Sequence, residues 1–242
     1  MILRLAGVSK RFGAVVVADN IDLEVARGEA LGIIGANGAG KSSLFNLITG
    51  VITPDAGIIQ LADRDLTRVP LRERCVAGIG RSFQIPRPFE SLTVFENLLV
   101  AAEYGREHGY RGAVDLCGRI LDQTGLAPYA NTLAGKLTLL NRKRLEMARA
   151  LATEPDIMLL DEIAGGLTEA ECRELVSFIK QLNQAGVTIV WIEHVVHALL
   201  SVVSRLIVLE FGRKIADGEP MAVMNDPEVR RSYLGIDEET AA

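Results

Sequence analysis

The chain has 242 residues, 49% of them hydrophobic and 24% charged, which is typical of a globular protein with a sizeable buried core. Its net charge of −5 argues against general nucleic-acid binding, so no nucleic acid is expected as a partner. Cys75, Cys117 and Cys172 form no C-x-x-C pair and indicate thiols in a reducing compartment. No segment resembles a signal peptide or a membrane span, so we expect any membrane role to come through a partner.

Apolar patterning predicts strands in the first third of the chain. Residues 2–8 and 15–25 flank a turn at Phe12-Gly13 and predict a small antiparallel sheet, and residues 57–61 and 79–83 are two further strands. From about residue 85 the pattern changes to helices that Gly and Pro separate, namely Thr93–Tyr104, Ala113–Gln123 and Asn141–Ala152.

Beyond residue 155, strands and helices alternate again. The apolar runs Ile157–Leu160 and Val187–Ile192 are typical of strands buried in a parallel sheet, and Glu169–Gln184 between them has helical spacing. We therefore predict an α/β fold in which a mostly parallel sheet with helices, joined by the small antiparallel sheet, is interrupted by a helical subdomain. The predicted division is residues 1–84 and 154–242 for the core and residues 85–153 for the helical subdomain.

One segment fits the phosphate-loop pattern G-x-x-x-x-G-K-[S/T] and lies between a strand-like run and a helix-like run. Its backbone N–H groups can converge on a phosphate chain, and its glycines leave room where a Cβ would block that approach. Lys41 can reach the β- and γ-phosphates, and the Ser42 hydroxyl can bind Mg²⁺. The alternative, a Gly-rich turn, is disfavoured by the flanking elements. We predict binding of a nucleoside triphosphate by Gly35, Ala36, Asn37, Gly38, Ala39, Gly40, Lys41, Ser42 and Ser43.

Two carboxylates, Asp161 and Glu162, directly follow the apolar run Ile157–Leu160. The carboxyl ends of parallel strands are where ligands of such sheets bind. We expect Asp161 to hold Mg²⁺ opposite Ser42, and Glu162 to orient and polarise the attacking water. The alternative is an ordinary solvated strand end, which the phosphate loop makes the weaker interpretation.

The next apolar strand ends in Glu193-His194. His194 therefore lies at the same edge of the sheet, where it could hydrogen-bond the γ-phosphate and the water. His108 and His197 have no such placement, and we expect them to be structural or solvent-facing.

In order and spacing these motifs resemble those of the ATP-binding subunits of ABC transporters, over essentially the whole chain. The resemblance implies a P-loop NTPase ABC ATPase core with an inserted helical subdomain, and ATP and Mg²⁺ as cofactors. It makes Phe12 the aromatic that stacks on adenine, and Gln84 the glutamine that touches Mg²⁺ and the water and faces the membrane partner. Asp161, Glu162 and His194 match the Walker B aspartate, the catalytic glutamate and the switch histidine.

The resemblance also implies partners and a location. These are transmembrane permease subunits, a second ATP-binding subunit and, indirectly, a periplasmic or surface solute-binding protein, at the cytoplasmic face of the membrane. Residues 89–99 and 226–235 look like the branched-chain amino acid uptake subfamily, whose related importers carry urea and other small solutes. The implied cargo is a branched-chain amino acid or a related small polar solute.

The signature Leu-Ser-Gly-Gly-Gln of this family is altered here to Leu137-Thr138-Leu139-Leu140-Asn141. Leu139 and Leu140 replace both glycines, and we expect both side chains to stand against the γ-phosphate on an opposite subunit. Ile163 replaces the proline after the catalytic glutamate, and Thr168 the final Asp or Asn of the next loop. The basic residues 142–144 are expected on a solvated or partner-facing side of the helix.

Three hypotheses follow. The chain is an importer ATPase that works in an asymmetric pair with a subunit whose signature is intact, or a nucleotide-binding assembly or regulatory subunit with little ATPase activity. The third is a soluble ABC protein acting on ribosomes or DNA, but such proteins usually carry two cassettes or a long coiled-coil insertion. A signalling GTPase is excluded because no Asn-Lys-x-Asp motif occurs. We favour the first and leave the choice of homodimer or heterodimer open.

Overall fold

The computed structural model describes residues 1–105 and 109–234. Its larger sheet has six strands in the order β10-β9-β3-β8-β7-β6, all parallel except β10 at one edge. A second, four-stranded sheet of order β2-β1-β4-β5 is antiparallel. The strands are β1 (Leu3–Phe12), β2 (Val15–Val25), β3 (Ala30–Ile34), β4 (Ala56–Leu61), β5 (Arg64–Asp65), β6 (Ile79–Arg81), β7 (Ile157–Asp161), β8 (Thr188–Ile192), β9 (Arg205–Glu210) and β10 (Arg213–Gly218).

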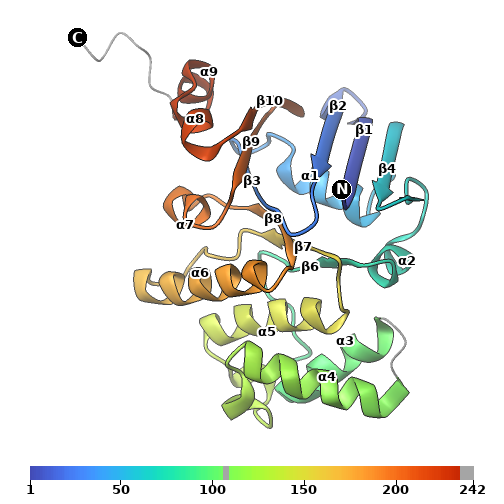
Figure 1. Cartoon of the computed structure of the whole chain (residues 1–242), viewed down its shortest axis with the longest axis vertical. Coiled ribbons are helices and arrows are strands. Elements are labelled where there is room, and N and C mark those ends of the chain that lie inside the picture. Colours follow the sequence, from blue (N-terminus) through green and yellow to red (C-terminus); the bar gives the residue numbers. More distant parts are fainter. Residues whose placement is uncertain (106–108, 235–242) are drawn as a thin grey trace.

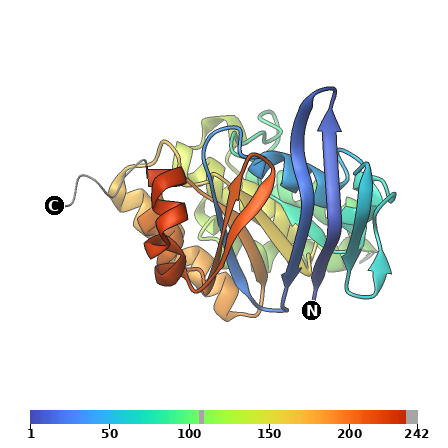
Figure 2. The ribbon, with the colours of Figure 1, turned by 90° about the horizontal axis from the view of Figure 1, so that it is seen from above.

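The helices cover the larger sheet and extend beyond it. Figure 1 shows α3, α4 and α5 gathered at one end of the molecule, with α6 between them and the sheet. Seen from above, the small sheet and the two C-terminal helices lie at opposite sides (Figure 2). The helices are α1 (Lys41–Thr49), α2 (Leu71–Val76), α3 (Val94–Tyr104), α4 (Gly109–Gln123), α5 (Leu139–Ala152), α6 (Glu169–Gln184), α7 (Val196–Leu200), α8 (Pro220–Asn225) and α9 (Pro227–Val229), with 3₁₀ turns at Ala127–Tyr129 and Ala134–Lys136 and a π turn at Arg230–Leu234.

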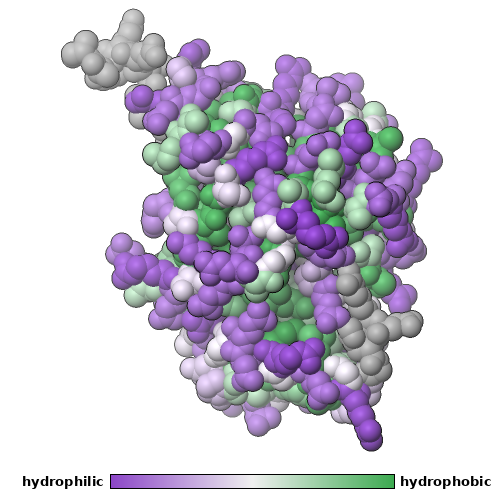
Figure 3. Space-filling model, viewed as in Figure 1, coloured by the Kyte–Doolittle hydropathy of each residue, from purple (hydrophilic) through white to green (hydrophobic). Residues whose placement is uncertain are grey.

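Two hydrophobic clusters hold these layers together. One joins the small sheet, α1 and one face of the larger sheet, and the other joins the opposite face to α3–α6. Strands β3, β7 and β8 are buried along their whole length because both faces are covered, which explains their continuous apolar sequences. Hydrophilic side chains cover most of the face in Figure 3, and hydrophobic ones show between them in small patches. No helix in the described ranges is long and apolar enough to cross a bilayer.

The predicted elements are found with ends that shift by up to four residues, as where β1 extends to Phe12 and α4 begins at Gly109, whereas α2, α7–α9, β9 and β10 were not predicted. Residues 15–25 and Glu169–Gln184 form the predicted strand and helix with the predicted bounds. Helix α5, predicted over Asn141–Ala152, begins two residues earlier at Leu139. Thr138 caps it by accepting a hydrogen bond from the Asn141 amide. The strand expected over 79–83 ends at Arg81, where the chain leaves the sheet. The division into a core and a helical subdomain stays a prediction, and His108 lies outside the described residues.

Candidate active site

The phosphate loop connects β3 to α1, as its sequence predicts. The N-cap of α1 is Gly40, which offers no side-chain cap to the first turn. The N–H groups of that turn are therefore available to an anion at the positive end of the helix dipole. The strand–loop–helix arrangement is confirmed.

Two glycines of this loop are required by the packing of the protein itself. A Cβ on Gly35 would lie 2.2 Å from the carbonyl oxygen of Leu209, and a Cβ on Gly40 would lie 2.5 Å from that of Val17. Only Gly38 faces open space, and its φ of +82° favours glycine. The expectation that phosphate approach explains the glycines is thus incomplete, because neighbouring backbone already excludes side chains at two of the three.

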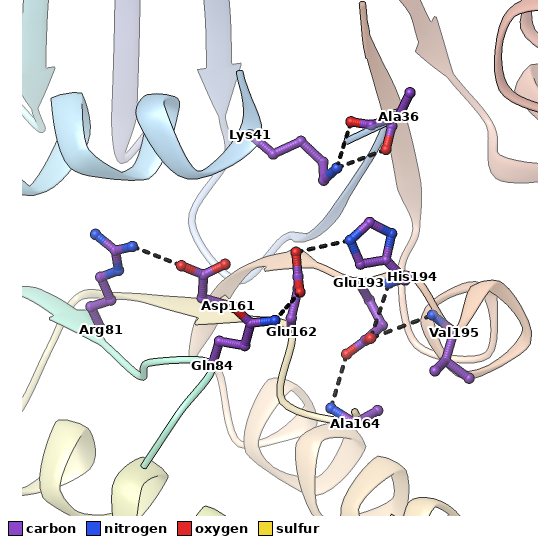
Figure 4. A network of polar contacts seen from close by, with 11 residues as sticks. Ala36, Lys41, Arg81, Gln84, Asp161, Glu162, Ala164, Glu193, His194 and Val195 are labelled. Carbon is purple, nitrogen blue, oxygen red and sulfur yellow. Dashed lines mark hydrogen bonds and ion pairs between the residues drawn. The ribbon is translucent and has the colours of Figure 1, made fainter. Parts of the chain in front are cut away.

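Lys41 folds back onto the loop. Its Nζ donates to the carbonyl oxygens of Gly35 at 2.7 Å and Ala36 at 3.0 Å (Figure 4). The lysine is buried, and burial lowers the pKa of its ammonium while the carboxylates of Glu162 and Asp161 oppose that shift. The Lys41 ammonium therefore lies close enough to Glu162 and Asp161 to be stabilised by their negative charges.

Of the three predicted catalytic side chains, Gln84 and His194 both contact the third, Glu162. Gln84 Nε2 donates to Glu162 Oε2 at 2.5 Å, and His194 Nε2 lies 2.9 Å from Glu162 Oε1 (Figure 4). They come from three places: the loop after β6, the end of β7 and the end of β8. The Glu162 amide donates to the Ile192 carbonyl, and its φ of +47° is uncommon for a residue with a side chain. The carboxylate is thus held on both oxygens at the carboxyl edge of the sheet.

Asp161 is held by Arg81, a residue to which the sequence analysis gave no role. Arg81 Nη2 donates to Asp161 Oδ2 at 2.7 Å, and both side chains are nearly buried. Arg81 also donates to Asn46 Oδ1, and its guanidinium lies over the rings of Phe45 and Phe83. The available signal was its position at the end of a strand; the sheet places β6 beside β7.

The three predicted Mg²⁺ ligands line one cavity of about 500 Å³. Ser42, Gln84 and Asp161 bring a hydroxyl, an amide and a carboxylate to it, and Mg²⁺ prefers such oxygen ligands. No group of three or more His, Cys, Asp and Glu side chains that could hold a metal alone exists within residues 1–105 and 109–234. A cation here would therefore take few protein ligands, which suits a metal that also binds phosphate oxygens and water.

Phe12 lies at the end of β1 with a side chain that is 51% exposed. The ammonium of Lys10 is 5.3 Å from the centre of its ring. An exposed aromatic face of this kind can stack on a planar group.

The altered signature forms the start of α5. Leu139 is 42% exposed, whereas Leu140 is 8% exposed and belongs to the core. The expectation that both leucines stand against a partner is therefore wrong for Leu140, since its side chain points into the protein. Ile163 is also buried, and Thr168 caps α6 through a capping box with Glu171.

The basic residues that follow the signature were expected on a solvated or partner-facing side. That expectation is wrong for Lys143, which is 3% exposed. Arg142 donates to the carbonyl oxygens of Leu137 and Gly135, and Arg144 pairs with Glu174. All three residues are engaged with their own chain.

Comparison with known proteins identifies the family of the chain. The sequence model of the ABC transporter family matches residues 18–165, and the model described as branched-chain amino acid ATP-binding cassette transporter matches residues 213–239. The chain is 36% identical to the high-affinity branched-chain amino acid transport ATP-binding protein LivG of Salmonella typhimurium, over 97% of this chain and 98% of that protein. BraF of Pseudomonas aeruginosa is 32% identical over the same shares.

Solved structures give the same result for the fold. The crystal structure of the ADP conformation of an ATP-binding cassette of an ABC transporter superposes with a TM-score of 0.88 at 31% identity, over 97% of this chain and 99% of that chain. A nucleotide-free cassette superposes with a TM-score of 0.87 at 30% identity, over 98% and 99%. The predicted ABC ATPase fold is confirmed. The chain belongs to the ATP-binding subunits of ABC transporters, in the branched-chain amino acid transport subfamily of LivG and BraF, and is an ATPase of that type.

Proposed function

We propose that this chain binds ATP with Mg²⁺ and hydrolyses the nucleotide to energise an importer for branched-chain amino acids or a related small polar solute. The observation that carries the proposal is the Glu162 carboxylate, held between Gln84 and His194. LivG and BraF are named as ATP-binding proteins of high-affinity branched-chain amino acid transport. The chemistry thus rests on the site, and the solute rests on the relatives.

The nucleotide is bound by the phosphate loop and the start of α1, whose N–H groups donate hydrogen bonds to the triphosphate. Lys41 exchanges its two loop carbonyls for oxygens of the β- and γ-phosphates, and the ring of Phe12 stacks on adenine. Ser42, Gln84 and Asp161 would hold Mg²⁺, which would neutralise negative charge on the phosphates.

Hydrolysis needs a group that takes a proton from the attacking water. Glu162 is placed for this, because Gln84 and His194 fix the directions of its two oxygens. His194 then contributes a hydrogen bond to the transferred phosphoryl group, which spreads its negative charge over fixed donors.

The chain works on a membrane without entering it. We place it at the cytoplasmic face, bound to permease subunits and to a second ATP-binding subunit, with a solute-binding protein delivering the cargo. The related cassette cbiO1 of Clostridium perfringens, with a TM-score of 0.83 and 26% identity, is described as part of an ABC transporter complex. That relationship supports an assembly in which this chain provides the ATPase.

Leu139 favours an asymmetric pair of ATPases. Its exposed side chain stands at the start of α5, where the family has a glycine. A site completed by this segment would be weak, whereas the chain's own phosphate loop, Glu162 and His194 could be completed by a partner with an intact signature. The second candidate is an assembly or regulatory subunit with little hydrolysis of its own. Phosphate release with and without the second ATPase separates them, because only the first predicts strong stimulation.

Transport in reconstituted vesicles tests the main proposal. With the permease and solute-binding subunits present, we expect ATP-dependent uptake of labelled leucine, isoleucine or valine. Lys41→Ala should abolish uptake because the phosphates lose a charge-assisted contact, whereas Lys180→Ala, at an exposed lysine of α6, should not. ATP hydrolysis without uptake of any of the three amino acids would contradict branched-chain amino acids as the transported solute. Absence of hydrolysis would contradict the ATPase role.

A further inference from the structure

Glu193, the residue before His194, is a buried carboxylate to which the proposed mechanism gives no role. Its side chain is 1% exposed and lies at the end of β8. Oε2 accepts a hydrogen bond from the Ala164 amide at 3.0 Å, and Oε1 accepts one from the His194 amide at 3.0 Å and a longer one from Val195 at 3.4 Å (Figure 4). One carboxylate thus satisfies three backbone donors of two loops.

The two loops are those that carry Glu162 and His194. Ala164 stands two residues after Glu162, and the His194 amide belongs to the residue whose ring contacts Glu162 at 2.9 Å. The Glu193 bridge between the two backbones therefore runs beside the side-chain bridge between the two residues. A change in the Glu193 bridge would therefore alter the separation of the Glu162 and His194 side chains.

The charge of Glu193 is not neutralised by an adjacent cation. No ion pair within 4 Å includes it in the part of the chain that the structure describes. The buried Lys143 of α5 compensates at longer range: burial lowers the pKa of its ammonium, and the charges of Glu193 and Glu162 oppose that shift. A buried charge kept under these conditions needs its backbone donors.

We propose that Glu193 is a positioning residue that sets the geometry of the Glu162–His194 pair by tying the two loops together. The inference rests on the proposed catalytic role of Glu162. Displacement of a reacting group by about 1 Å commonly costs about 10²-fold in rate. Loss of the Glu193 bridge therefore slows hydrolysis by about 10- to 10²-fold without weakening ATP binding, because its hydrogen bonds reach no residue of the phosphate loop.

Glu193→Gln is the sharpest perturbation. The glutamine has the same shape, but only its carbonyl oxygen accepts hydrogen bonds, so its NH₂ group faces a backbone donor on one side. Glu193→Asp keeps two acceptor oxygens and withdraws them by one methylene. The aspartate variant should lie between wild type and Glu193→Gln in every measurement below.

The readout is the ring of His194 in the full chain. The sequence has three histidines, so ¹³C-labelled histidine gives few ring resonances, and His194→Ala assigns one of them. We expect that resonance to move in Glu162→Gln and to move toward the same position in Glu193→Gln. Calorimetry should give an ATP affinity within about twofold of wild type, since the binding residues are untouched.

Glu29→Gln is the matched control. Glu29 is another largely buried carboxylate that accepts a backbone N–H, from Ala26 at 2.6 Å, but it precedes β3 and so lies at the opposite edge of the sheet from Glu162 and His194. Its replacement should lower stability without moving the His194 resonance. Equal movement in Glu29→Gln would overturn the proposal, because general loosening would then explain the effect.

Two further outcomes overturn it. These are a wild-type hydrolysis rate in folded Glu193→Gln, and a slowed rate with an unmoved His194 resonance. If Glu193→Gln fails to fold, Glu193→Asp carries both measurements. Normal hydrolysis in Glu162→Gln would instead contradict the proposed base, and the resonance would still report whether Glu193 positions the pair.

Discussion

Restoring the signature glycines one at a time should separate two leucines that the sequence presents as equivalent. Leu139 is exposed at the start of α5, and a Cβ built on Gly166 would lie 3.4 Å from its Cδ2 atom. Leu140 packs inside the core shared by α3–α6 and the sheet. Replacement by glycine therefore removes a surface side chain in one case and a core side chain in the other.

The expected costs differ several-fold. Truncation of a buried leucine to alanine costs about 2–5 kcal/mol, and glycine in a helix adds about 1 kcal/mol, so Leu140→Gly should cost about 3–6 kcal/mol. Leu139→Gly should cost less than about 1 kcal/mol, since the side chain is half exposed and at the helix start. Urea denaturation followed by the fluorescence of the single, buried Trp191 measures both.

The variant with the smaller expected loss of stability, Leu139→Gly, should show the larger change in ATP hydrolysis. In the chain paired with itself, Leu139→Gly together with Thr138→Ser should raise ATP hydrolysis by at least about tenfold, because one donor to the developing charge is commonly worth about 10²–10³ in rate. Phosphate release at saturating ATP gives the rate. Brisk hydrolysis by the wild-type homodimer, unaffected by the replacement, would refute the obstruction by Leu139 and the asymmetric pair. Wild-type stability of Leu140→Gly would refute the assignment of Leu140 to the core.

Three further results are expected. Glu162→Gln in the assembled transporter should bind ATP but hydrolyse it about 10²-fold more slowly or worse in a single turnover, and an unchanged rate would mean that another group is the base. Arg81→Met should lower the free energy of unfolding by about 3–5 kcal/mol because it leaves the buried Asp161 unpaired, whereas loss of an exposed ion pair costs at most about 1 kcal/mol; equal urea midpoints for Arg81→Met and wild type would contradict this. Burial raises the pKa of Cys117 from 9.0 to about 11, so the folded chain keeps a proton that the unfolded chain loses. Relative to Cys117→Ala, which lacks this group, the wild-type stability should therefore fall as the pH rises between about 9 and 11, and an equal pH dependence of the two urea midpoints would count against that burial.

Part of the secondary structure was readable from the sequence, where the apolar periods are regular, whereas the short helices and the strands β9 and β10 after residue 195 were not predicted. The strands β3, β7 and β8 are continuous apolar runs, and α6 has an uninterrupted helical stripe with a capping box at Thr168. The convergence of Glu162 and His194 was also predictable, since the strands that precede them, β7 and β8, are parallel and end at one edge of the sheet. The family resemblance supplied the roles of Phe12 and Gln84, which their residue types alone do not indicate.

Lys143 shows a signal that was present but outweighed. It stands three residues after Leu140 and four before Met147, and both of these are buried on the same face of α5. Helical spacing alone therefore places Lys143 inside, whereas its charge and its basic neighbours suggested solvent. Arg81 is a different case, because its partner Asp161 is 80 residues away and only the sheet order brings them together.

The carboxyl ends of β7 and β8 carry three acids, Asp161, Glu162 and Glu193, and their hydrogen-bond partners distinguish them. Glu193 accepts hydrogen bonds from three backbone amides, whose directions are fixed by the fold. One oxygen of Asp161 accepts a hydrogen bond from the nearly buried Arg81. Glu162 is hydrogen-bonded through its side chain, among the described residues, only to the side chains of Gln84 and His194. Side-chain partners can rotate to admit water, and a proton acceptor must be able to exchange its partners. On these grounds we assign Glu162 as the general base, Asp161 as the proposed Mg²⁺ ligand and Glu193 as the proposed positioning residue.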